Sequence, residues 1–192
     1  MKIYLVRHGQ TTGDVEDRYG GDYDDHLTDE GKSQSKVLAK KLKNKNIEII
    51  FSSPRIRAEE TAKIVADALK IPMQTVEDIR ERNAYGILTG MIKSEAKIKY
   101  PKEFEEAKSY KNTITDAEEY DHFKERILAS FEEITSKDQK TIAIITHGGP
   151  ISCFFREVLK KEIFGLRDCG MVELEKNGDY KIVKVDGLMV KE

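Results

Sequence analysis

Two stretches decide the fold: KIYLVRHG at residues 2–9 and TIAIITHGG at residues 141–149. Each is a short apolar run, rich in β-branched residues, that ends in a histidine followed by glycine, as expected of a buried strand that runs into a loop. In a parallel sheet, residues just beyond the carboxyl ends of the strands face the ligand crevice. Glycine at such a place lets a bulky anion approach the backbone. His8 and His147 are therefore the first candidates for chemistry.

Strand and helix patterns alternate between and beyond these stretches. Thr28 or Asp29 can cap a helix, and Ser53-Pro54 is typical of a helix start with proline at the first position. The alternation predicts an α/β fold, a three-layer αβα sandwich with a mainly parallel central sheet. We expect a single domain over residues 1–192, with a small cap region at about 83–115. Expected strands are 2–7, 47–51, 73–76, 141–146, 170–174 and 180–185, the last two joined by a turn at 176–179; expected helices include 94–108, 120–134 and one opened by residues 147–150.

The composition excludes some classes of function. The 192 residues are 39% hydrophobic and 35% charged, with a formal net charge of −2, so no global field favours nucleic acid or an acidic membrane. The apolar run at the N-terminus stops at Arg7, too early for a signal peptide. Cys153 and Cys169 show no metal-ligand or redox spacing. We expect a cytoplasmic protein that binds neither nucleic acid nor a membrane.

Arginines near the two histidines point to an anion. Arg7 precedes His8, and Arg57 follows the predicted helix start at Pro54. Guanidinium groups supply the bidentate donors that suit phosphate oxygens, and helix N-termini at Pro54 and Pro150 would add to them. A metal site is the competing interpretation, because acidic residues follow at 14, 16 and 17. A guanidinium beside the first histidine argues against it.

The motif Arg7-His8-Gly9 resembles the signature of the histidine phosphatase superfamily, whose fold is also called phosphoglycerate mutase-like. Further elements similar to the family's motifs follow in the family's order, and the resemblance covers residues 2 to about 175. They are LTDEG at 27–31 with Gln34, SSPRIRAEETA at 52–62, Glu81 ahead of YG at 85–86 and TG at 89–90, and THGG at 146–149.

The resemblance implies a role for each matching residue. His8 resembles the nucleophile that takes the phosphoryl group, while Arg7, Arg57 and His147 resemble the pocket that holds the phosphate oxygens together with it. Glu81 resembles the general acid that protonates the leaving oxygen and then deprotonates water. These roles suit the chemistry, since phosphoryl transfer needs positioning and charge neutralisation, and imidazole is a good neutral nucleophile near pH 7. No metal is implied.

Two departures from the family pattern affect the expected pocket. Asp14 stands where many relatives have asparagine, and it puts an anion where a neutral phosphate contact often lies. His26 stands where proline is usual. We interpret His26 and His122 as surface residues.

The substrate is less clearly indicated. The YGILTGM stretch at 85–91 resembles phosphoglycerate mutases, but the arginine pair with which mutases grip the substrate carboxylate is missing. A short cap favours hydrolysis, because a mutase must exclude water. We expect a phosphomonoesterase acting on a small phosphorylated metabolite; the alternatives are a mutase that depends on 2,3-bisphosphoglycerate and a non-catalytic module that binds phosphorylated ligands. We expect four residues to contact the substrate: Gln10, Thr11, Tyr85 and Lys93. The sequence is also compatible with a homodimer.

Overall fold

The central sheet has six strands in the order β3-β2-β4-β1-β5-β6 within residues 1–191, the part of the chain that this computed structural model describes. The four strands β3, β2, β4 and β1 are parallel to one another, and β5 and β6 complete the sheet in antiparallel pairing. In chain order the elements are β1 (Lys2–Arg7), α1 (Thr12–Val15), α2 (Asp29–Leu42), β2 (Ile49–Ser52), α3 (Ile56–Leu69), β3 (Met73–Thr75), η1 (Glu77–Ile79), η2 (Gly86–Leu88), α4 (Lys93–Lys99), α5 (Pro101–Glu106), α6 (Tyr120–Thr135), β4 (Thr141–Thr146), α7 (Gly148–Glu157), β5 (Glu162–Asn177) and β6 (Asp179–Lys191).

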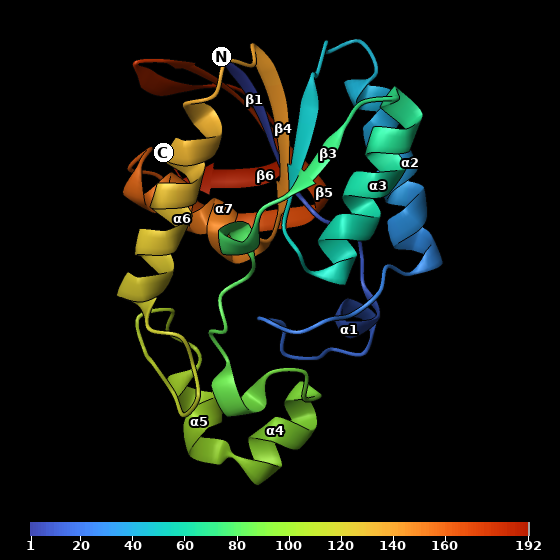
Figure 1. Ribbon diagram of the computed structural model, residues 1–192. Coiled ribbons are helices and arrows are strands. Elements are labelled where there is room, and N and C mark those ends of the chain that lie inside the picture. Colours follow the sequence, from blue (N-terminus) through green and yellow to red (C-terminus); the bar gives the residue numbers. More distant parts are fainter. Residues whose placement is uncertain (192) are drawn as a thin grey trace.

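Helices cover both faces of the sheet (Figure 1). Successive side chains of β1 point to opposite faces: Ile3 packs with apolar residues of α6 and α7, and Tyr4 with those of α2 and α3. The apolar side chains of β1 are buried on both faces of the sheet, which explains why the strand is a continuous apolar run rather than an alternating one. The predicted three-layer αβα sandwich with a mainly parallel sheet is confirmed.

The pairing of β1 with β4 brings the two histidines together. These neighbouring parallel strands pair Arg7 with Thr146, so the residues that follow them, His8 and His147, leave the sheet at the same edge. The backbone N–H of His8 donates to the carbonyl of Thr146 at 3.0 Å. The strand order thus brings these two side chains side by side, although 138 residues separate them in the sequence.

The segment from η2 to α5 lies beyond this edge of the sheet, and Figure 1 shows it at the same end of the molecule as α1. It has an apolar cluster of its own, in which Leu88, Ala96 and Ile114 are buried with Tyr19 from the loop after α1. Gly86 makes a tight junction there: its φ is +41°, and a Cβ would lie 2.0 Å from the carbonyl oxygen of Thr115. Two separate chain segments therefore hold this region over the sheet edge.

The prediction of one helix over 94–108 is wrong. The structure has two short helices, α4 and α5, which meet at Tyr100 (φ −134°, ψ 62°). Pro101 causes the break, because a proline ring disfavours the helical conformation in the residue before it.

Helix starts and the last strands also differ from expectation. Of the two predicted caps of α2, Thr28 or Asp29, the structure has Thr28, whose hydroxyl accepts the N–H of Gly31. Pro54, however, lies outside α3, whose N-cap is Arg55. β5 and β6 extend well beyond the predicted 170–174 and 180–185. Register shifts within the two strands interrupt the alternation of inward and outward side chains by which a strand is recognised in a sequence.

Candidate active site

One ring nitrogen of His8 carries a proton and the other carries a lone pair. Its Nδ1 lies 2.8 Å from the carbonyl oxygen of Gly9, which can only accept, so Nδ1 carries the proton. Its Nε2 accepts the Nε–H of Arg57 at 3.2 Å. Burial lowers the pKa of His8 well below 6.5, Arg57 and Arg7 lower it further, and the hydrogen bond to Gly9 offsets part of the effect. His8 is therefore a neutral imidazole whose Nε2 is free of a proton.

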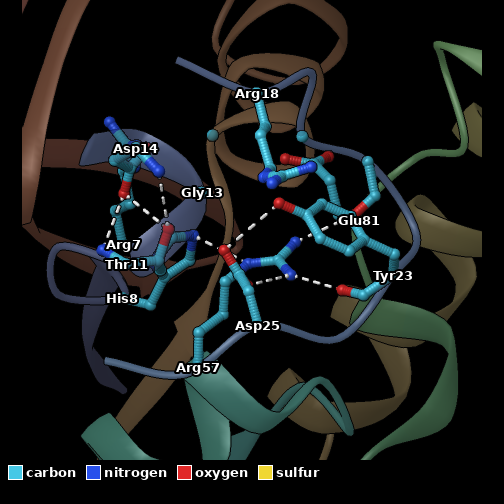
Figure 2. A pocket seen from close by; sticks show the side chains of 13 residues that line it. Arg7, His8, Thr11, Gly13, Asp14, Arg18, Tyr23, Asp25, Arg57 and Glu81 are labelled. Atoms are coloured by element: carbon cyan, nitrogen blue, oxygen red, sulfur yellow. Dashed lines mark hydrogen bonds and ion pairs between the residues drawn. The ribbon is translucent and has the colours of Figure 1, made fainter. Parts of the chain in front are cut away.

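Arg57 is fixed by several acceptors at once. Its Nη1 donates to the carbonyl of Tyr23 at 2.6 Å and to Oδ1 of Asp25 at 3.0 Å, and its Nη2 donates to the carbonyl of Gly21 at 2.9 Å. The side chains of Arg57 and Asp25 are only 4% and 8% exposed. Figure 2 shows the guanidinium held among these groups beside His8. Asp25 is thus the buried counter-ion of Arg57, a role that the sequence did not reveal.

Arg7 is held by contacts to β5 and to α1. Its Nη1 donates to the carbonyl of Leu166 at 2.7 Å, and its Nη2 lies 3.3 Å from Asp168 and 3.4 Å from Asp14. The other oxygen of Asp14 accepts from the backbone and the hydroxyl of Thr11, closing a capping box on α1. Asp14 therefore faces Arg7, and two carboxylates neutralise part of this arginine's charge.

His147 lies behind His8 and is not exposed. The two ring centroids are 5.1 Å apart in an edge-on arrangement. Nε2 of His147 is 2.7 Å from the hydroxyl of Ser53, and within the described chain its buried Nδ1 has no hydrogen-bond partner. Burial lowers the pKa of His147 well below 6.5, followed by Arg57 and His8. An unpaired buried nitrogen is costly, but His147 does not line the cavity beside His8.

Glu81 follows η1 and reaches the same place from across the sheet edge. Its carboxylate accepts the backbone N–H of Arg82 at 2.8 Å and that of Gly149 at 3.0 Å. A Cβ at residue 149 would lie 2.0 Å from Oε1 of Glu81, so only glycine admits this approach. Burial raises the pKa of Glu81 above 4.5, while the two backbone bonds and the nearby arginines hold the rise back. The raised pKa suits a proton donor.

Two connected cavities meet at Glu81. The smaller, of about 130 Å³, is lined by Arg7, His8, Arg57 and Glu81 among others. The larger, of about 450 Å³, opens toward the η2–α5 segment and shares Arg7 and Glu81 with the smaller one. A phosphate beside His8 would leave the rest of its ester in the larger cavity, with Glu81 at the junction where the bridging oxygen would lie.

The four assigned substrate contacts do not stay together. Thr11 lines the smaller cavity, and Tyr85 and Lys93 line the larger one. Gln10 lines neither, because its side-chain oxygen accepts the hydroxyl of Thr28 at 2.8 Å. The assignment of Gln10 to the substrate has no support in this geometry.

The acidic residues that suggested a metal site as the competing interpretation are paired with cationic side chains. Asp14 faces Arg7, Glu16 pairs with Arg18, and Asp17 pairs with Lys93. Within residues 1–191, no group of three or more histidine, cysteine, aspartate or glutamate side chains is placed to hold a metal ion. In the same range, no helix is long and apolar enough to cross a membrane. His26 and His122 are 66% and 71% exposed, so both are surface residues as predicted.

A neutral histidine in an arginine-lined pocket, with a protonatable carboxyl at its rim, defines a site for phosphoryl transfer. Comparison with known families agrees: the profile of the histidine phosphatase superfamily (branch 1) matches residues 3–187. The chain belongs to this family and is a histidine phosphatase-type enzyme, as its motifs predicted.

Individual relatives include phosphatases and mutase-like proteins. The chain is 25% identical to phosphoserine phosphatase 1 of Hydrogenobacter thermophilus over 189 residues, 97% of this chain and 87% of the relative. It is 31% identical to phosphoglycerate mutase-like protein 4 of Arabidopsis thaliana over 163 residues, 80% of this chain and 69% of the relative. A metal-independent phosphoserine phosphatase of Arabidopsis thaliana is 28% identical over 170 residues, 85% and 71% of the two chains. The solved structure of Bacillus stearothermophilus YhfR superposes with a TM-score of 0.87 at 25% identity, covering 97% of this chain and 96% of that one.

Proposed function

We propose that this protein hydrolyses a small phosphomonoester through a phosphohistidine at His8. The observation that carries the proposal is the state of His8 Nε2, an unprotonated nitrogen that faces Arg57 in a pocket which Glu81 also lines. Histidine phosphatase relatives act on small phosphorylated metabolites, as the names of the phosphoserine phosphatases indicate.

The first step forms the phosphoenzyme. Nε2 of His8 attacks phosphorus, the bond from phosphorus to the ester oxygen breaks, and Glu81 gives its proton to that oxygen, so the alcohol leaves neutral. Arg7 and Arg57 neutralise the charge on the phosphoryl oxygens, and Nδ1 of His147 is proposed as a further donor. The bond from His8 Nδ1 to Gly9 stabilises the positive charge that the ring gains.

The second step returns His8 to its starting state. Glu81, now ionised, removes a proton from a water molecule that attacks phosphorus opposite Nε2, and phosphate leaves. Glu81 is protonated again at the end, so protons balance over the cycle. No step calls for a metal ion, and we propose that none is used; turnover should therefore persist in EDTA.

The cap supports hydrolysis over mutase activity. A mutase needs cations that hold the substrate carboxylate during the lifetime of the phosphohistidine intermediate. Within the cap region, the ammonium of Lys93 pairs with Asp17 and that of Lys108 pairs with Glu105, so neither lysine offers an unpaired cation there. Mutase activity stays the second candidate, because Tyr85 lines the larger cavity and a mutase-like relative is 31% identical.

The test is a rapid-quench experiment with a labelled phosphomonoester. We expect acid-labile label on the protein, released mainly as inorganic phosphate, and no labelling of His8→Ala. His122→Ala, which removes an exposed histidine, is the matched control and should label as the unchanged protein does. Label recovered mainly in an isomerised ester would establish the mutase. Ligand binding with no labelled protein and no turnover would establish a binding module instead.

The remaining features of the proposed function are a small-molecule partner and a cytoplasmic location. The cavity of about 450 Å³ lies within the range of small-ligand sites. A homodimer is compatible with this proposal, and sedimentation of the purified protein would decide it.

A further inference from the structure

The cationic side chains that line the larger cavity differ in how many of their nitrogens have a hydrogen-bond or ion-pair partner. Arg18 pairs with Glu16 and donates to the carbonyl of Gly90. Arg82 is buried, and all three of its nitrogens donate to backbone carbonyls. Lys93 pairs with Asp17, as described above.

Arg156 is the exception. It lies near the end of α7 and lines the same cavity. Its Nε donates to the hydroxyl of Tyr120 at 3.0 Å. Among residues 1–191, neither Nη1 nor Nη2 of Arg156 takes part in a hydrogen bond or ion pair. The outer edge of this guanidinium is therefore open to a ligand.

Neighbouring aromatic rings hold the guanidinium in place. Its central carbon lies 4.0 Å from the ring centroid of Tyr110 and 5.4 Å from that of Tyr120. Ser152, one helical turn earlier on α7, lines the cavity on the same face of the helix and adds a hydroxyl. A stacked arginine loses less side-chain freedom when it binds an anion than a free one does.

The nearest carboxylate does not occupy the open edge. Oε1 of Glu157 accepts the hydroxyl of Tyr120 at 2.7 Å and lies 3.8 Å from Nε of Arg156. It therefore faces the Nε side of the guanidinium. It reduces the local positive charge but leaves the fork of Nη1 and Nη2 without an acceptor.

We propose that Arg156 is the residue that binds a carboxylate on the leaving group, so that the preferred substrates are phosphomonoesters carrying a carboxylate at their far end. This inference rests on the proposed function and names the substrate class of that site. The planar fork of arginine matches a carboxylate with two parallel hydrogen bonds. One open cation outside the phosphate pocket also balances a single negative charge better than a second phosphate dianion. The carboxylate would be bound by α7, a helix that packs on one face of the sheet, rather than by an arginine pair on the cap.

The competing explanation is that Arg156 is only a strut. It stacks on Tyr110, which follows α5, and bonds Tyr120 of α6, so it could simply fasten the cap segment to the helical layer. A strut would matter equally for every ester, whereas a carboxylate ligand would matter only for esters that carry one.

The experiment compares 3-phosphoglycerate with its methyl ester, which differ by one negative charge at the far end. The measured quantity is the ratio of kcat/KM for the two esters. We expect the unchanged protein to prefer the acid and Arg156→Gln to lower the ratio by about 10- to 100-fold, the usual worth of a hydrogen-bonded charge pair. Arg156→Lys keeps the charge without the fork and should lower it less. Lys161→Gln removes one exposed charge of α7's C-terminal flank and is the matched control.

Each outcome decides something. If the unchanged protein shows no preference for the acid, or if Arg156→Gln lowers both rates and leaves the ratio unaltered, Arg156 is a strut and the inference is wrong. Should Arg156→Gln fail to fold, the ratio for Arg156→Lys and for Tyr120→Phe, which removes the hydroxyl that orients Nε, still tests it. Failure of the proposed function would look different, since para-nitrophenyl phosphate would then give no His8-dependent turnover.

Discussion

The negative charge of Asp25 weakens the attraction of Arg57 for phosphate, because the two side chains form an ion pair. The substitution Asp25→Asn tests this effect. Both side chains are nearly buried and the joining atoms are 3.0 Å apart. Removing the charge of one partner from a buried pair typically costs 3–5 kcal/mol. Asparagine can still accept the N–H of Arg57, and two carbonyls remain, so we expect a loss of about 3 kcal/mol in the free energy of unfolding.

Added phosphate should restore part of this loss. A ligand at about 100 times its dissociation constant stabilises the folded state by about 2.7 kcal/mol. In Asp25→Asn the charge of Arg57 is no longer balanced, so phosphate should bind more tightly, and each tenfold in affinity adds about 1.4 kcal/mol at a fixed concentration.

Urea unfolding with and without inorganic phosphate measures both effects. Asp29→Asn is the control, since its carboxylate is fully exposed and pairs with the exposed Lys32; it should change little. If Asp25→Asn unfolds within about 0.5 kcal/mol of the unchanged protein, a value usual for surface substitutions, the pair does not stabilise the fold. If phosphate stabilises both proteins equally, the pair does not oppose anion binding.

Three further predictions concern catalysis and pH. Glu81→Gln should slow hydrolysis of alkyl phosphates by about 10²–10⁴-fold and para-nitrophenyl phosphate far less, because that leaving group needs no proton; equal slowing in steady-state assays would remove Glu81 from the acid role. The pKa of His8 is lowered in the folded state, so the unfolded chain binds more protons below pH 6.5 and stability should fall as pH drops from there; His8→Ala should flatten this fall in urea unfolding between about pH 6.5 and 5, by at most about 1.4 kcal/mol per pH unit, and an unaltered slope would mean that His8 titrates normally. Asp14→Asn removes a carboxylate 3.4 Å from Arg7 and should lower KM about 2- to 5-fold, as expected for a partly exposed pair; a rise in KM would show that the capping of Thr11 matters more.

The positions that could be predicted from sequence are those set by local pattern and strand pairing. His8 and His147 each follow an apolar run, and once the runs are taken as neighbouring parallel strands, their meeting at one edge follows. The start of α2 can be predicted to within one residue, Thr28 or Asp29, because capping depends on nearby residues only.

Contacts between distant segments could not be predicted in the same way. Asp168 reaches Arg7 from the antiparallel hairpin, and its position depends on the register shift between Leu166 and Met171. The open edge of Arg156 depends on three elements packing around it. The break at Tyr100, in contrast, is a local effect that Pro101 signals in the sequence.

The long hairpin of β5 and β6 also determines how the sheet meets solvent. β6 is an edge strand of 13 residues, and its outer backbone groups offer a template to which another strand could add. Lys181, Lys184 and Lys191 are exposed along it, and the left-handed Gly187 (φ +77°) bends it. Charged side chains and a bent backbone deter edge-to-edge pairing. On β6 these features act against the pairing that the exposed side chains of Val183, Val185 and Met189 would favour. The opposite edge strand, β3, is three residues long and offers little to pair with.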